Sequence, residues 1–149
     1  MSERATRTLR IERTFDAPAE RVFEAWTSEE VLRRWFHVYP EWDTPTAEVD
    51  LQVGGEVRVV MRDPSDGAEY GARGHYTLIE PPRRLAMRWA FDDDPENVQT
   101  IELEFSEREG RTTVVMINSG ISTEPRRESQ DRGWNGCFDS LERALAQFS

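Results

Sequence analysis

Hydrophobic and polar residues alternate along much of the chain between residue 8 and residue 118, and a period of two predicts β-strands. Short turn sequences, such as Gly54-Gly55 and the Pro- and Gly-containing segment 63–67, separate the alternating segments. The predicted strands are 8–15, 47–53, 56–62, 69–80, 84–91, 100–105 and 112–118. Strands that follow one another through short turns predict an antiparallel sheet.

Two short helices are predicted between the first strand and the others. Pro18 suits the first turn of a helix, where its missing N–H costs nothing, and the segment 18–26 places its large apolar residues on one face. Thr27 and Glu30 have the spacing of a capping box, which predicts that a second helix begins there. The two helices therefore form a kinked pair that ends near Phe36.

A long helix is predicted at the C-terminal end, beginning near Pro125. Apolar residues recur there at steps of three and four and form one stripe: Trp134, Cys137, Phe138, Leu141, Leu145 and Phe148. A lone long helix buries such a stripe on the sheet. We therefore predict an α+β fold in which a curved antiparallel sheet of about seven strands surrounds the long C-terminal helix, with a cavity between them.

Length and charge narrow the classes of partner. The 149 residues suit a single domain spanning 1–149. The net charge of −10 would be repelled by nucleic acid. No apolar run is long enough to cross a bilayer, and the charged N-terminus is not a signal peptide, so we expect no membrane insertion and a cytoplasmic location.

Residue usage also excludes several chemistries. All 19 basic residues are arginine, which excludes a lysine Schiff base or a P-loop lysine. Cys137 is the single cysteine, and the two histidines, His37 and His75, lie far apart, so no metal site is predicted. Ser, His and Asp follow no familiar catalytic order, and no glycine-rich phosphate loop is present. We predict no catalytic residue, metal or cofactor from these patterns.

Three stretches of the chain resemble a known superfamily. They are FDAPAERVFEAWTSEEVLRRWF (15–36), VGGEVRV (53–59) with GHYTLIEPPRRLAMRW (74–89), and NSG (118–120) with GWNGCFDSLERAL (133–145). Together with the element order, they resemble the START-like, or SRPBCC, superfamily with its helix-grip fold. Within it, the chain is most similar to the activator of heat-shock-protein-90 ATPase family in its stand-alone bacterial form. The resemblance implies a hydrophobic pocket between the sheet and the long helix.

The resemblance and the strand parities together predict the pocket wall. Tyr76 is expected to face inward and His75 outward. A bulge near Thr77 and Leu78 would invert this assignment, and it stays an alternative because Tyr76 and Ile79 both suit inward positions but are an odd number of residues apart. Plain core packing is the alternative explanation for the apolar members of the set. The predicted ligand-binding residues are Trp35, His37, Val59, Tyr76, Met87, Trp89, Ile101, Met116, Gln130, Trp134 and Phe138.

Gly133 and Gly136 interrupt the long helix. Each costs about 1 kcal/mol against alanine, so a compensating role is expected. They either allow close packing against a strand or leave room for a ligand beside Trp134.

Three functions remain open at this point. The first is binding of a small apolar or amphipathic molecule. The second is a cyclase- or hydrolase-like enzyme in which His37, Tyr76 or Gln130 supplies the polar chemistry. The third is a chaperone-linked module, although the co-chaperone form carries an additional N-terminal domain. A homodimer through the outer sheet face is a further possibility, because β-branched residues lie on that parity: Val60, Val115 and Ile117.

The segment before Gly120 departs from the family pattern. It reads Asn118-Ser119 where many relatives carry His-Ser. A role attached to that histidine in relatives therefore does not transfer to this chain.

Overall fold

The computed structural model describes residues 6–147, and its seven strands form one antiparallel sheet. The strands are β1 (Arg7–Phe15), β2 (Asp43–Val49), β3 (Glu56–Arg62), β4 (Glu69–Glu80), β5 (Arg84–Phe91), β6 (Gln99–Arg108) and β7 (Arg111–Ile121). Their order across the sheet is β1-β7-β6-β5-β4-β3-β2. The helices are α1 (Ala19–Thr27), α2 (Glu29–Trp35) and α3 (Glu124–Gln147). The predicted fold is confirmed.

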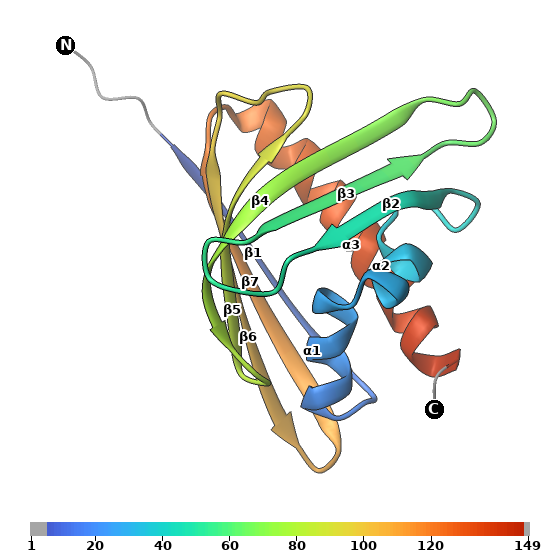
Figure 1. Ribbon diagram of the computed structural model, residues 1–149, viewed down its shortest axis with the longest axis vertical. Coiled ribbons are helices and arrows are strands. Elements are labelled where there is room, and N and C mark those ends of the chain that lie inside the picture. The colour runs from blue at the N-terminus through green and yellow to red at the C-terminus, as the bar shows by residue number, and fades with distance from the viewer. Residues whose placement is uncertain (1–5, 148–149) are drawn as a thin grey trace.

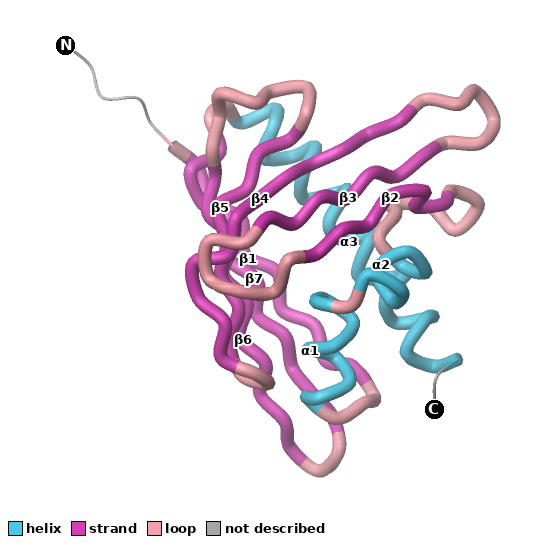
Figure 2. Tube along the Cα trace, in the orientation of Figure 1, coloured by secondary structure: helices cyan, strands magenta, loops and turns pink. Residues whose placement is uncertain are grey.

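The sheet is strongly curved. The strands β2 to β4 run at a steep angle to β5 to β7, and α3 crosses the hollow side of the bend (Figure 1). Of the two short helices, α2 packs against β2, and α1 packs against α2, β6 and β7 (Figure 2). Among the closest element contacts, α3 touches β1, β7 and α2.

Strand β4 contains the irregularity considered near Thr77 and Leu78, but this does not invert the facing of Tyr76 and His75. The register of β4 against β5 shifts between Tyr76 and Leu78, and Ile79 pairs with Leu85. Tyr76 is buried and His75 is exposed, as the parity predicted. Ile79 is partly buried against the core, so both apolar side chains face inward across the bulge.

Two local predictions were wrong. Strand β2 runs over Asp43–Val49 rather than 47–53, because the chain turns from Asp50 onward; the Gly55 N–H donates to the Gln52 carbonyl, and Gly54 has a φ of 87°. The cap of α2 is Ser28 rather than Thr27, and its hydroxyl accepts from the Val31 N–H at 3.3 Å.

Helix α3 buries its apolar stripe as expected. The stripe residues Trp134, Cys137, Phe138, Leu141 and Leu145 are all buried, whereas Phe148 lies outside the described residues. Within residues 6–147, no helix is both long and apolar enough to cross a membrane.

Candidate functional site

Aromatic side chains fill the deep part of the space between the sheet and α3. Trp134 on α3 has ring-centroid distances of 5.7 Å to Phe36, 6.0 Å to Trp89 and 6.1 Å to Trp26, and Trp26 lies 4.9 Å from Trp35. Offset and edge-on arrangements at these distances are favourable for aromatic rings. The aromatic cluster formed by these five residues closes the inner end of the predicted cavity.

An open pocket of about 850 Å³ lies beyond the aromatic cluster, toward the free end of the β3–β4 hairpin. The first half of α3 forms one wall. The opposite walls come from the ends of β3, β4 and β5, and from the irregular segment 36–42 that links α2 to β2. The volume falls within the usual range for small-molecule sites. The predicted cavity is therefore present, but it lies nearer the edge of the sheet than the sequence indicated.

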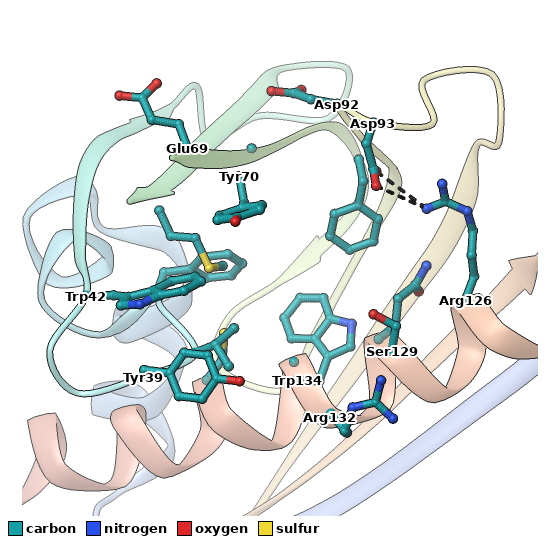
Figure 3. Close-up of a pocket in the computed structure, with 18 of the residues that line it drawn as sticks. Tyr39, Trp42, Glu69, Tyr70, Asp92, Asp93, Arg126, Ser129, Arg132 and Trp134 are labelled. Atoms are coloured by element: carbon teal, nitrogen blue, oxygen red, sulfur yellow. Dashed lines mark hydrogen bonds and ion pairs between the residues drawn. The ribbon is translucent and has the colours of Figure 1, made fainter. Parts of the chain in front are cut away.

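Three aromatic residues form an exposed wall of this pocket. The rings of Trp42 and Tyr70 are stacked, with centroids 5.3 Å apart and an angle of 6° between their planes. Tyr39 meets Trp42 edge-on at 5.0 Å. Figure 3 shows Tyr70 over Trp42, with Trp134 on the far side of the pocket. Exposed aromatic faces of this kind offer apolar contact area to a flat molecule.

The charged residues at the pocket mouth are largely paired with one another. Arg58 makes two hydrogen bonds to Asp92, at 2.7 and 2.8 Å, and this pairing lowers the pKa of the Asp92 carboxyl. Arg126 on α3 lies 3.5 Å from Asp93 and 3.3 Å from Asp94 (Figure 3). The ion pairs of Arg126 tie the first turn of α3 to the β5–β6 turn at one end of the pocket.

Gln130 is the buried polar residue of the pocket wall. It is 9% exposed, and neither its amide nitrogen nor its amide oxygen has a hydrogen-bond partner among the described residues. A buried polar group without a partner costs about 1–3 kcal/mol. The other buried amides are paired, since the Asn118 amide N–H donates to the Gln99 oxygen at 2.9 Å and the Trp134 indole N–H donates to Asn118 at 3.3 Å. Gln130 therefore stands out as an unused donor and acceptor.

The structure divides the predicted site residues into three groups. Gln130 and Trp134 line the open pocket. Val59, Tyr76, Met87, Trp89 and Ile101, with Trp134, surround a small internal void of about 10 Å³. Four predicted residues border neither space: Trp35, His37, Met116 and Phe138.

The four residues of the third group are occupied by core packing. Phe138 and Met116 are fully buried, and Phe138 packs on Phe15 and Trp26. The Trp35 indole N–H donates to the Ala25 carbonyl at 2.8 Å. Strand parity and helix periodicity report which residues face inward, but they do not report which inward residues face open space.

His37 is buried beside β2 rather than at the pocket mouth. The Thr44 hydroxyl donates to the Phe36 carbonyl at 2.7 Å, so it accepts from the Nδ1–H of His37 at 3.0 Å. Burial lowers the pKa of His37, and nearby Arg143 lowers it further, opposed by Asp43. His37 is therefore a neutral side chain that fixes the segment after α2.

Three residues around the small internal void carry buried polar groups. The Tyr76 hydroxyl and the indole nitrogens of Trp26 and Trp89 lack a hydrogen-bond partner among the described residues. Burial raises the pKa of the Tyr76 hydroxyl, so it stays protonated. His37, Tyr76 and Gln130 thus occupy three separate places, and their placement does not assemble an acid–base site.

We expect Tyr76→Phe to raise the free energy of unfolding by about 1 kcal/mol, because it removes a buried hydroxyl without a partner. Urea denaturation followed by circular dichroism measures the change. Tyr39→Phe is the control, because Tyr39 is exposed and its change is expected to stay within about 0.5 kcal/mol. A loss of about 1 kcal/mol or more in Tyr76→Phe would show that the hydroxyl has a partner in solution.

The sequence reasoning missed most of the open pocket wall. Met61, Tyr70 and Phe91 continue the inward parities of Val59, Tyr76 and Trp89 toward the strand ends, so the alternation contained a signal for them. Tyr39 and Trp42 lie in the irregular segment 36–42, where no periodicity marks them.

Two further chemistries can be assessed at the site. Cys137 lines the pocket but is buried, and burial raises the pKa of its thiol, which disfavours the reactive thiolate. Within the described part of the chain, no three His, Cys, Asp or Glu side chains come together as a metal site would require.

Comparisons with known proteins agree with this architecture. The chain is 27% identical over 127 residues to a mouse protein named activator of 90 kDa heat shock protein ATPase homolog 1; the match covers 85% of the chain but only 33% of the mouse protein. A solved AHSA1-like protein from Aeromonas hydrophila is 25% identical, covers 95% of this chain and 93% of its own, and has a TM-score of 0.78. The AHSA1 protein from Silicibacter pomeroyi shares the fold at 21% identity, with a TM-score of 0.83 and coverage of 96% and 100%.

A comparison with models of protein families identifies the family of the chain. The model described as activator of Hsp90 ATPase homolog 1-like protein matches residues 16–146, which is nearly the whole chain. The match begins just after β1 and ends within the last turn of α3. The chain belongs to the family of proteins like the activator of Hsp90 ATPase homologue 1.

Proposed function

We propose that this protein binds a small apolar or amphipathic molecule in the open pocket between the β3–β4 hairpin and α3. The observation that carries the proposal is the pocket itself, about 850 Å³ with an exposed aromatic wall. Large exposed aromatic surfaces facing a concavity are typical of ligand sites. The family match is compatible with a ligand-binding scaffold. The cytoplasmic location and the homodimer stay predictions.

The test uses a neutral environment-sensitive dye, Nile red, followed by native mass spectrometry of the protein purified from cells. We expect Nile red to bind with a blue shift, and we expect Tyr70→Ala to weaken its binding about three- to tenfold, because one face of the stacked pair is lost. Tyr70 is half exposed, so its truncation leaves the core intact.

Val53→Ala is the matched control for this experiment. Val53 is an exposed apolar residue on the β2–β3 turn, and it does not line the pocket. Its substitution is expected to leave Nile red binding unchanged. Absence of dye binding to the wild-type protein, together with no co-purifying molecule, would contradict the proposal.

Contact with a chaperone is the second candidate. It is supported by the name of the mouse relative and by the family description. The chain spans only a third of that relative. The chaperone candidate therefore rests on a name, whereas the ligand proposal rests on the pocket. A binding titration against the host's 90 kDa heat-shock protein homologue at tens of micromolar tests it. No detectable binding would remove this candidate.

A further inference from the structure

The unpartnered amide of Gln130 identifies the polar group that a ligand must offer. The side chain is more than nine-tenths buried, and it lies on the wall of the open pocket. Its amide N–H₂ and C=O are both buried and have no partner among the described residues, so a ligand that reaches this part of the wall meets an unused hydrogen-bond donor and acceptor next to each other. A ligand group with the complementary acceptor and donor side by side satisfies both at once.

The surroundings of Gln130 do not supply that partner. The nearby amide network is closed, because Asn118 bonds to Gln99 and receives the indole N–H of Trp134. Ser129, the preceding pocket residue, is exposed to solvent. Gln130 is therefore the residue that would make a buried hydrogen bond to a ligand in this pocket.

The charges at the pocket mouth favour a neutral ligand. Asp92 is held by Arg58, and Asp93 and Asp94 are held by Arg126, so these groups are already engaged. The one buried polar side chain on the wall, Gln130, carries no charge. Glu69 and Arg132 also line the pocket, but both are exposed to solvent. An ionised ligand group would therefore lose its hydration beside the buried Gln130 without gaining a buried opposite charge there.

The aromatic wall sets the shape of the rest of the ligand. The rings of Tyr39, Trp42 and Tyr70 line one side of the pocket with apolar surface, and the stacking of Trp42 on Tyr70 holds these two rings parallel. Trp134 and Phe91 add aromatic surface to the lining. Flat aromatic rings gain most from such surfaces, through offset stacking and edge contacts.

We propose that the ligand is a neutral aromatic molecule bearing an amide group, a carboxamide or a lactam, whose C=O and N–H pair with the Gln130 side chain while its ring lies on the aromatic wall. This inference rests on the proposed function, because it names the class of molecule for the same pocket. It assigns Gln130 as the residue that selects the ligand.

The experiment compares three probes of one size: 2-naphthamide, methyl 2-naphthoate and 2-naphthoate. Their dissociation constants are measured by isothermal titration with the wild-type protein and with Gln130→Met, an apolar side chain of similar length. We expect the wild-type protein to bind the amide about tenfold more tightly than the ester or the carboxylate, since the ester lacks the donor and the carboxylate is charged. In Gln130→Met the amide is expected to lose this advantage, while the ester binds at least as well as before.

Gln52→Met is the matched control. Gln52 is exposed on the β2–β3 turn, does not line the pocket, and its substitution is expected to keep the preference for the amide. Gln130→Met is expected to unfold at or above the wild-type temperature, because it removes an unpartnered buried amide. The preference of the wild-type protein is measured whether or not the variant folds.

The outcomes separate the two proposals. If the ester and Nile red bind but the amide has no advantage, the pocket proposal stands and the role of Gln130 is overturned. An amide advantage that survives in Gln130→Met also overturns it. If no probe and no dye binds the wild-type protein, both proposals fall.

Discussion

Replacing Phe138 by alanine is expected to lower the free energy of unfolding by about 3–5 kcal/mol. The Phe138 side chain is 0% exposed and packs against β1 and α1. Its ring lies 6.0 Å from Phe15 on β1 and 5.8 Å from Trp26 on α1, and the Arg13 guanidinium lies 5.7 Å from its centroid. Truncation removes all three contacts and leaves a cavity that the surrounding strands cannot close. Urea denaturation measures the loss.

Glu142→Ala is the control for Phe138→Ala. Glu142 lies one turn further along α3 and is exposed, so its change is expected to stay within about 0.5 kcal/mol. A loss below about 1 kcal/mol in Phe138→Ala would mean that the sheet does not grip α3 at this point. Because total stabilities are about 5–15 kcal/mol, the expected loss is a large share of the whole.

The prediction for Phe138 also shows what periodicity can and cannot supply. The apolar stripe on α3 and the alternation in β3 to β7 were sufficient to predict the fold. Each pattern identifies the one face of its helix or strand that is buried. They could not separate Phe138, in the closed core, from Trp134, which borders the open pocket four residues earlier. Both belong to the same face of one helix. The difference arises from how α3 crosses a curved sheet, which is a tertiary property.

The position of the pocket depends on volume rather than on pattern. The inner part of the space is filled because Trp26 on α1 and Trp89 on β5 pack on Trp134 there, and Trp35 on α2 packs on Trp26. The outer part stays open because the walls there are strand ends and an irregular segment. The sizes of the side chains can be read from the sequence. Which part of a cavity they fill depends on how they pack in the folded protein.

The aromatic wall shows which pocket residues a sequence pattern can predict and which it cannot. Tyr70 lies on the same face of β4 as Tyr76, so the alternation of residues in this strand could have predicted it as a wall residue. Trp42 was not, because the segment 36–42 has no regular secondary structure and its path is set by contacts with α3. One of those contacts is made at Gly136, which links the long helix to the pocket wall.

Gly136→Ala is expected to lower the free energy of unfolding by about 1–3 kcal/mol, although alanine is the better helix former. A Cβ at Gly136 would lie 2.5 Å from the Val38 carbonyl oxygen and 2.7 Å from Val38 Cγ1. The carbonyl belongs to the backbone, so the segment 36–42 must move as a whole. Gly133→Ala is the matched control, because its Cβ would have only Val38 Cγ2 near it, at 3.9 Å. We expect Gly133→Ala to raise stability by about 1 kcal/mol.

The opposite signs of these two variants decide between the two roles considered for the glycines. Gly136 permits close packing, against the segment 36–42 rather than against a strand, whereas Gly133 borders the pocket with space beside it. Because Tyr39 and Trp42 follow Val38 in the displaced segment, Gly136→Ala is also expected to weaken Nile red binding. If both variants prove more stable than the wild-type protein, the segment 36–42 moves to accommodate the added methyl group at little cost. The aromatic wall would then be mobile rather than fixed by the helix, and the pocket would lose its preformed shape.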